Sequence, residues 1–373
     1  MSYDHSEEIT EKSLWISLSS ILGIGAQTFC QLLKAFGSPS NIYEANNQQL
    51  KEIVSEKIAA EINKGINEDT LTDALNWLSQ PNNHLVTLAD PYYPKALLEI
   101  TDPPPLLYAK GNLALLNQPS IAIVGSRNAS VQGEKNAEAF AHGLCGYGLC
   151  IVSGLALGID GAAHRGALSA NGATIAVVGT GLDIVYPAKH RDLAHQIVER
   201  GLIVSEFALG TPSKPQNFPK RNRIISGLSL GCLVVEANLQ SGSQITARLA
   251  AEQGREVFAI PGSIHSPMSK GCHQLIKQGA KLVDSLQDIV EELDLNKHVS
   301  LITDDEANHS DETGSKTATI HPILGLMGYE AITLENLVHL SRLTVSEVSS
   351  MLMLLELEGR VTSLAGGQYQ KLA

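Results

Sequence analysis

The residues most suited to chemistry stand together near the middle of the chain, in the stretch FPKRNR. Lys220, Arg221 and Arg223 place three cations within four residues, and Asn222 could hydrogen-bond either a phosphate or a base. Such cations repel one another unless an anion lies near, and arginine favours bidentate contact with phosphate. A solvated helix face is the plainer alternative. We expect an anion site at this helix start.

The distribution of charge supports a local site. The chain of 373 residues has a formal net charge of -12, which argues against a protein that coats nucleic acid with its whole surface. Residues 187–223 nevertheless contain seven Lys/Arg and three Asp/Glu. A polyanion would therefore meet a local basic patch.

A second anion site is predicted at the turn Ser241-Gly242-Ser243, which opens an expected helix over residues 244–253. Unpaired backbone N–H groups and the positive end of the helix dipole favour an anion there. The alternative is a well-capped helix without a ligand. We treat Ser241, Gly242 and Ser243 as a secondary phosphate site.

The elements that must position these residues alternate between short apolar strands and helices from Ser120 onward. This alternation predicts a doubly wound, mostly parallel sheet, in which ligands bind beyond the carboxyl ends of the strands. Those ends read GSR, SGL, GTG, SEF, EAN and PGS in turn, so small residues keep the backbone open along one rim. Arg127 ends the first strand, where ligand contact is a better interpretation than a structural ion pair.

Enzyme signatures are incomplete at this rim. Neither the G-x-G-x-x-G turn of nicotinamide enzymes nor a P-loop is present. Ser153, Asp160 and His164 suggest a catalytic triad, but no G-x-S-x-G turn frames the serine. Asp160 and His164 lie one helical turn apart, which favours a local hydrogen bond. We predict no catalytic residue, no metal and no cofactor.

The five cysteines stand singly, without a C-x-x-C pair, as reduced thiols of a cytoplasmic protein do. No apolar run approaches the length of a membrane span, so no membrane contact is expected.

The domain boundaries follow from composition and periodicity. We expect a small N-terminal helical domain of helix-hairpin-helix or SAM-like type at 1–84, a Pro-rich connection at 85–119, a Rossmann-like domain at 120–295, an acidic flexible linker at 296–318 and a winged-helix domain at 319–373. The helices of the last domain are expected at 321–327, 334–339 and 345–358, before a β-hairpin. Its recognition helix is acidic, so we interpret the module as a protein contact or a structural appendage.

The N-terminal domain contains the turn Leu22-Gly23-Ile24-Gly25, which resembles hairpins that bring backbone N–H groups to a DNA phosphate. The flanking helices carry few cations apart from Lys34. A tight turn between packed helices is therefore the favoured interpretation.

Six long motifs follow one another in an order that resembles the DNA-processing protein A (DprA/Smf) family. They are GSR, SGLALGIDGAAH, VVGTGLDIVYP, FPKRNRIISGLS, EANLQSGSQITARLAAEQGREVFAIPG and GCHQLIKQGAKLV, and the resemblance runs from the YYPKALLEITDPPPLLYAKG connection through Val283. It implies an extended Rossmann-like domain that binds single-stranded DNA in a basic pocket and forms a homodimer. It also implies a DNA recombination role in which the protein protects incoming strands and loads RecA during natural transformation of competent cells.

We expect nucleic-acid contacts from ten residues: Gly125, Ser126, Arg127, Ser153, Gly154, Lys189, Lys220, Arg221, Asn222 and Arg223. The resemblance implies eight of these contacts, all except those of Gly125 and Asn222. The segment Lys270 to Val283 lies at the end of the predicted sheet, where an exposed edge favours a two-fold partner. The expected dimer residues are His273, Leu275, Ile276 and Leu282.

A second hypothesis is a small-nucleotide-processing enzyme of the lysine-decarboxylase-like Rossmann group. Those enzymes carry a P-G-G-x-G-T turn followed closely by a glutamate. Here SGSQIT leads to Ala247-Arg248, so the catalytic acid is missing. We rank this hypothesis below single-stranded DNA binding.

Overall fold

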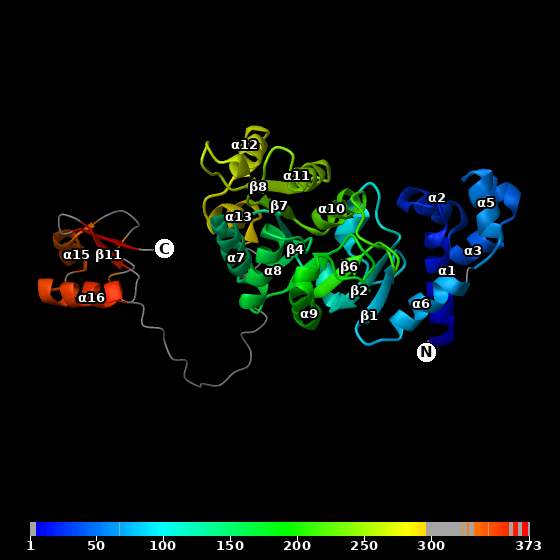
Figure 1. Cartoon of the computed structure of the whole chain (residues 1–373), viewed down its shortest axis with the longest axis horizontal. Helices are drawn as coiled ribbons and strands as arrows, with labels where there is room; N and C mark the ends of the chain where they lie inside the picture. The colour runs from blue at the N-terminus through cyan, green and yellow to red at the C-terminus, as the bar shows by residue number, and fades with distance from the viewer. Residues whose placement is uncertain are drawn as a thin grey trace. The chain divides into compact units, whose positions relative to one another are not determined.

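The computed structural model describes residues 5–66, 68–295, 323, 327, 332–341, 343–357, 361–364 and 368–371. The chain divides into two compact units, one ending at Glu306 and the other beginning at Ala307 (Figure 1).

A nine-stranded sheet forms the centre of the first unit. Its strands are β1 (Asn83–Thr87), β2 (Leu106–Gly111), β3 (Ser120–Val124), β4 (Cys150–Ser153), β5 (Thr174–Val177), β6 (Leu202–Ser205), β7 (Gly231–Val234), β8 (Glu256–Ala259) and β9 (Lys281–Leu282). Their order is β1-β2-β6-β5-β4-β3-β7-β8-β9. Pairs from β6 to β9 are parallel, and β1 and β2 add antiparallel pairs at the other end. The predicted doubly wound, mostly parallel sheet is confirmed.

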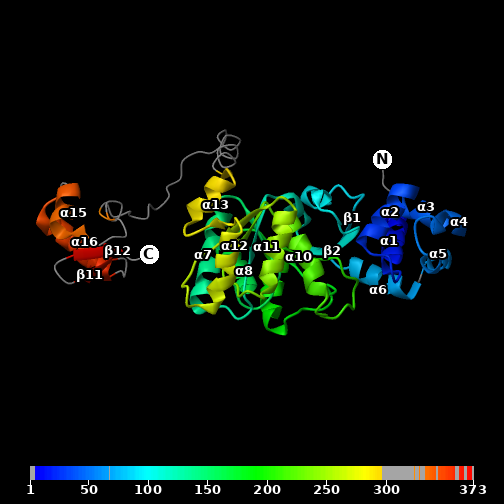
Figure 2. The ribbon, with the colours of Figure 1, turned by 90° about the horizontal axis from the view of Figure 1, so that it is seen from above.

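Helices cover both faces of this sheet. They are α7 (Val131–Cys145), α8 (Ile159–Ser169), α9 (Arg191–Arg200), α10 (Asn217–Leu228), α11 (Gly242–Glu252), α12 (Lys270–Lys277) and α13 (Leu286–Glu292). Alternate residues of β3 point to opposite faces, as strand geometry requires. Ile121 and Ile123 pack in the cluster with α7 and α8, whereas Ala122 and Val124 pack in the cluster with α10 and α11. Figure 2 shows α10 and α11 side by side over the sheet.

The Pro-rich connection is part of the fold. Its strand β2 pairs antiparallel with β6, and β1 pairs antiparallel with β2. The short 3-10 helix η1 (Lys95–Glu99) lies between these two strands in the chain, and η2 (Leu113–Asn117) follows β2. The Tyr93 hydroxyl donates to the Pro104 carbonyl oxygen at 2.7 Å. The sequence predicts only a Pro-rich connection over residues 85–119. The proline run obscured β2, whose first four residues are buried.

Six helices form the N-terminal domain: α1 (His5–Ser20), α2 (Ala26–Phe36), α3 (Pro39–Glu44), α4 (Asn47–Lys51), α5 (Glu56–Asn63) and α6 (Glu68–Leu78). Their core includes Trp15 and Phe29 and extends to Leu106 and Tyr108 of β2. The helices, blue in Figure 1, are therefore packed onto the antiparallel end of the sheet.

The second unit contains β10 (Ile332–Thr333), α15 (Leu334–Ser341), α16 (Val345–Leu357), β11 (Val361–Leu364) and β12 (Gln368–Lys371), with strand order β10-β12-β11. The last two predicted helices and the hairpin strands are confirmed. The predicted linker at 296–318 and most of the helix predicted at 321–327 lie outside the described residues.

Within the described part of the chain, no helix is long and apolar enough to cross a membrane. The five cysteines are free thiols, and Cys150, Cys232 and Cys272 are buried.

Acid sensitivity follows from His164 in α8, which is fully buried with Nδ1 2.7 Å from Thr174 Oγ1. Burial, together with nearby positive groups, lowers its pKa from the ordinary 6.5 to about 3. Between these values the unfolded chain binds a proton that the folded chain does not. The stability present above pH 6.5 is therefore lost as the pH falls.

We predict that the free energy of unfolding falls by about 2 kcal/mol more between pH 7 and pH 5 in the wild type than in His164→Asn. The asparagine removes the titrating ring, so only the pH slope, and not the absolute stability, is compared. Urea unfolding of both proteins at pH 7 and pH 5 measures the change in the free energy of unfolding. Equal slopes in the two proteins would contradict the prediction.

Candidate nucleic-acid interface

A cleft of about 620 Å³ opens at the rim of the sheet. Its walls include the loops after β3 and β7 and the first turns of α10 and α11. Among its lining residues are Gly125, Ser126, Arg127, Phe218, Arg221, Asn222, Ser241, Gly242 and Ser243. The two anion sites predicted separately from the sequence therefore line one cavity, which we call the rim cleft.

Sheet topology explains why these segments meet. The chain runs from β3 through β4 and β5 to β6 on one side, and then returns to place β7 on the other side of β3. Crossovers leave in opposite directions at this point, which is where doubly wound sheets bind ligands. The N–H of Ser126 donates to the carbonyl oxygen of Glu236 at 2.8 Å, which joins the two loops.

Arg127 is the exposed cation of the rim cleft. Its guanidinium carbon lies 5.0 Å from the centre of the Phe218 ring, and the Tyr186 ring centre lies 5.9 Å from that of Phe218. The arrangement combines a positive charge with aromatic faces on which an unstacked base could lie.

The first turn of α11 also lines the rim cleft, and it is polar. Ser241 caps the helix, with its Oγ accepting from the N–H of Ser243 at 3.3 Å, and the two hydroxyls lie 2.7 Å apart. Asn222 Nδ2 donates to the Gly242 carbonyl oxygen at 3.4 Å. The sequence allows this turn to be interpreted either as a phosphate site or as a capped helix start. Both interpretations remain open, because Ser241 caps the helix and the same turn lines the cleft.

Arg221 lines the cleft but is buried, with 4% of its surface exposed. Its Nη1 donates to the Val177 carbonyl oxygen at 2.9 Å, while Nε has no hydrogen-bond partner. A methyl group on Gly154 would lie 1.5 Å from Nη1, so the guanidinium occupies the space that this glycine leaves open. Burial raises the pKa of the neighbouring Asp160 carboxyl, and the charge of Arg221 opposes that rise.

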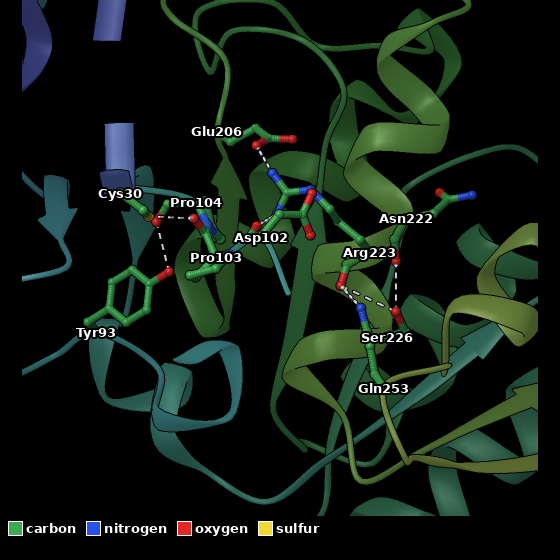
Figure 3. A network of polar contacts seen from close by, with 10 residues as sticks. All are labelled: Cys30, Tyr93, Asp102, Pro103, Pro104, Glu206, Asn222, Arg223, Ser226 and Gln253. Carbon is green, nitrogen blue, oxygen red and sulfur yellow. Dashed lines mark hydrogen bonds and ion pairs between the residues drawn. The ribbon is translucent and has the colours of Figure 1, made fainter. Parts of the chain in front are cut away.

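Arg223 lies in an ion-pair network and is not among the residues that line the rim cleft, so its DNA contact stays a prediction (Figure 3). Its Nη1 donates to the Asp102 carbonyl oxygen at 2.8 Å, Nε lies 3.2 Å from Asp102 Oδ2, and Nη2 pairs with Glu206. The anion that the cation cluster requires is thus supplied by the protein. Only 9% of the side chain is exposed, so a buried guanidinium needs these partners.

The other predicted contacts occupy different surroundings. Lys220 and Lys189 are exposed but lie outside the rim cleft. Ser153 is buried, and its hydroxyl donates to the Ile123 carbonyl oxygen at 2.6 Å, so it joins two strands. Gly154 lines a smaller adjoining pocket of about 60 Å³ together with Arg127 and Phe218. DNA contact by these residues stays a prediction.

The possible triad does not form among the described residues. Ser153 bonds to a backbone carbonyl, His164 lies against Thr174, and Asp160 Oδ2 accepts from the N–H of Ala156 at 3.3 Å. Nor do the described residues contain a group of three or more His, Cys, Asp or Glu that could hold a metal ion. Sequence reasoning missed Asp102 and Glu206, the acidic partners of Arg223, because these ion pairs join distant segments.

The expected dimer edge is present as a strand edge, since β9 ends the sheet. Leu282 is 45% exposed there, whereas Leu275 is buried and Ile276 packs partly against the core. His273 Nε2 lies 3.0 Å from the Gly262 carbonyl oxygen. Leu282 is thus the most exposed of the four, and the dimer stays a prediction.

Comparison with known proteins assigns the chain to a family. The sequence model of DNA recombination-mediator protein A matches residues 84–294, and the DprA winged helix domain matches residues 308–367. Protein Smf of Escherichia coli is 44% identical over 299 residues, covering 80% of each chain. Protein Smf of Synechocystis is 34% identical over 394 residues, covering 97% of this chain and 99% of its own.

Two solved structures share this fold. The X-ray structure of DNA processing protein A from Streptococcus pneumoniae has a TM-score of 0.67 and 40% identity, covering 78% of this chain and 99% of its own. DNA processing protein A from Helicobacter pylori, described for its single-stranded DNA binding mode, has a TM-score of 0.52 and 31% identity, covering 58% and 96%. From the matched domains and these relatives, the chain belongs to the DprA/Smf family of DNA recombination-mediator proteins.

Proposed function

We propose that this protein is a non-catalytic, cytoplasmic mediator that binds single-stranded DNA, protects it and loads RecA onto it during natural transformation. The observation that carries the proposal is the exposed Arg127 guanidinium over the Phe218 ring, in the rim cleft that the first turn of α11 also lines. The Helicobacter pylori relative, described for single-stranded DNA binding, supports it.

The chemistry of the cleft favours a single strand over a duplex. Phosphate oxygens suit Arg127 and the backbone N–H groups at the start of α11. Phe218 and Tyr186 offer ring faces that only an unstacked base can use, and stacking of this kind is tolerant of sequence. A duplex already stacks its bases internally, so it would engage the cation without the rings.

The alternative, a small-nucleotide-processing enzyme, lacks an acid after the Ser/Gly turn: α11 continues from Thr246 to Ala247 and Arg248. Asp160 is the carboxylate that lines the rim cleft, and it lies beside the buried Arg221. Incubation with nucleoside monophosphates discriminates the two functions. Release of free base would favour the enzyme, and intact nucleotides would favour the mediator.

We predict that single-stranded oligonucleotides bind far more tightly than duplexes, and that affinity falls steeply with salt because phosphate contacts release counterions. Arg127→Ala should weaken binding by about 1–3 kcal/mol and reduce the salt slope by about 0.7. Fluorescence anisotropy across salt concentrations measures both quantities.

The matched control is Lys34→Ala, which removes an exposed cation from the last turn of α2, outside the rim cleft. It should leave affinity nearly unchanged. Arg221→Ala is unsuitable as a test, because it would leave a cavity and deprive Asp160 of its neighbouring charge. Equal affinity for single strands and duplexes, or no effect of Arg127→Ala, would contradict the proposal.

We further predict that the wild type sediments as a dimer at micromolar concentration and that Leu282→Asp sediments as a monomer. The exposed β9 edge offers unpaired backbone groups and an apolar side chain to a two-fold partner, and a carboxylate there would lose its water at the interface. Leu98→Asp, at an exposed leucine of η1, is the control. A monomeric wild type would exclude the dimer.

A further inference from the structure

A second groove of about 490 Å³ lies where the N-terminal domain meets the rim. One wall is the glycine hairpin at the start of α2, which includes Gly23, Ile24 and Gly25. The other wall includes Lys220 of α10 and Glu206 and Phe207, which follow β6. We call this cavity the hairpin groove.

The hairpin exposes backbone donors to this groove. Gly23 has a φ of 100°, which makes the turn, and Gly25 caps α2 without a side-chain hydrogen bond. The first backbone bond of the helix runs from the N–H of Phe29 to the Gly25 carbonyl oxygen at 2.9 Å. The N–H groups of Ala26, Gln27 and Thr28 therefore lack acceptors within the helix, and no acidic residue stands in its first turn.

The hairpin has few cations in its own sequence, but the fold brings Lys220 to the same groove. Lys220 is exposed and lines the hairpin groove, although it lies far from the hairpin along the chain. A phosphate in this groove would meet an ammonium group on one wall and the positive end of α2 on the other. Sequence reasoning favoured a simple tight turn because it could not bring Lys220 to this place.

Carboxylates on the wall of the hairpin groove restrict the chemistry of its ligand. Glu206 pairs with Arg223, and Asp102, whose side chain is 36% exposed, lines the same groove. An exposed carboxylate acceptor favours a ligand that carries N–H donors and disfavours a simple anion. Phe207 and Ile24 add apolar surface to the same groove. A nucleotide combines a phosphate, N–H donors and an apolar ring face.

We infer that the hairpin groove holds a further segment of the single strand that occupies the rim cleft, an inference that rests on the proposed function. The first turns of α10 connect the two cavities, because Phe218, Arg221 and Asn222 line the rim cleft whereas Lys220 lines the hairpin groove. A strand leaving the cleft over this helix start reaches the hairpin. The N-terminal domain thereby lengthens the DNA footprint.

The test is Gly25→Asp, which places a carboxylate among the free N–H groups. Gly25 has an extended backbone with φ −92° and ψ 178°, and an added Cβ would touch nothing within 4 Å. Aspartate is a favoured N-cap, so the variant should fold at least as stably as the wild type. Gly25→Ala adds only a methyl group and is the matched control.

Affinity is measured by anisotropy for oligothymidylates of about 4 and about 16 nucleotides, a range of lengths typical of single-strand sites. Gly25→Asp should weaken binding of the longer strand about tenfold and leave the shorter one within about twofold. Lys220→Ala should show the same dependence on length, whereas Gly25→Ala and Lys34→Ala should bind both strands as the wild type does.

Two outcomes overturn the inference: Gly25→Asp binds the longer strand with wild-type affinity, or it weakens both lengths equally. Failure of the proposed function is distinguishable, because the shorter strand would then bind without dependence on Arg127. Unaltered thermal unfolding of Gly25→Asp confirms that the comparison concerns folded protein.

Discussion

The pairing of Arg223 with Asp102 and Glu206 is the constraint on which the arrangement of both cavities depends. It joins the connection before β3, the segment after β6 and the start of α10. Removing one partner of a buried ion pair leaves an uncompensated charge and costs about 3–5 kcal/mol. The helix start that borders both the rim cleft and the hairpin groove is therefore fixed by charge as well as by packing. Its position does not require DNA.

The cations of FPKRNR therefore have different roles. Arg221 fills the space beside Gly154, and Arg223 is neutralised by carboxylates, so neither offers a free charge to solvent. Lys220 remains exposed, and Arg127 joins the rim from a different loop. A cluster that appears uniform in sequence thus contains both structural and surface charges. Its two arginines shape the cavity in which a polyanion would lie.

The sequence predicted the sheet and its rim because both depend on local patterns: apolar strands such as β3 and small residues at their ends. It also located the Ser/Gly turn and the helix start. It could not show that they line one cavity, since that depends on β7 lying beside β3. The partners of Arg223, Asp102 and Glu206, were equally hidden, because these ion pairs join distant segments. Strand β2 was missed because neighbouring prolines suggested a linker.

The close approach of Arg221 to Gly154 makes the evolution of the two positions interdependent. Even an alanine at position 154 would collide with the guanidinium, so the order in which substitutions arise matters. A side chain at position 154 would displace the guanidinium from its hydrogen bond to the Val177 carbonyl oxygen unless position 221 had first become smaller. The reverse order passes through an intermediate in which the arginine has moved. Such epistasis should appear as correlated change at these two positions among homologues.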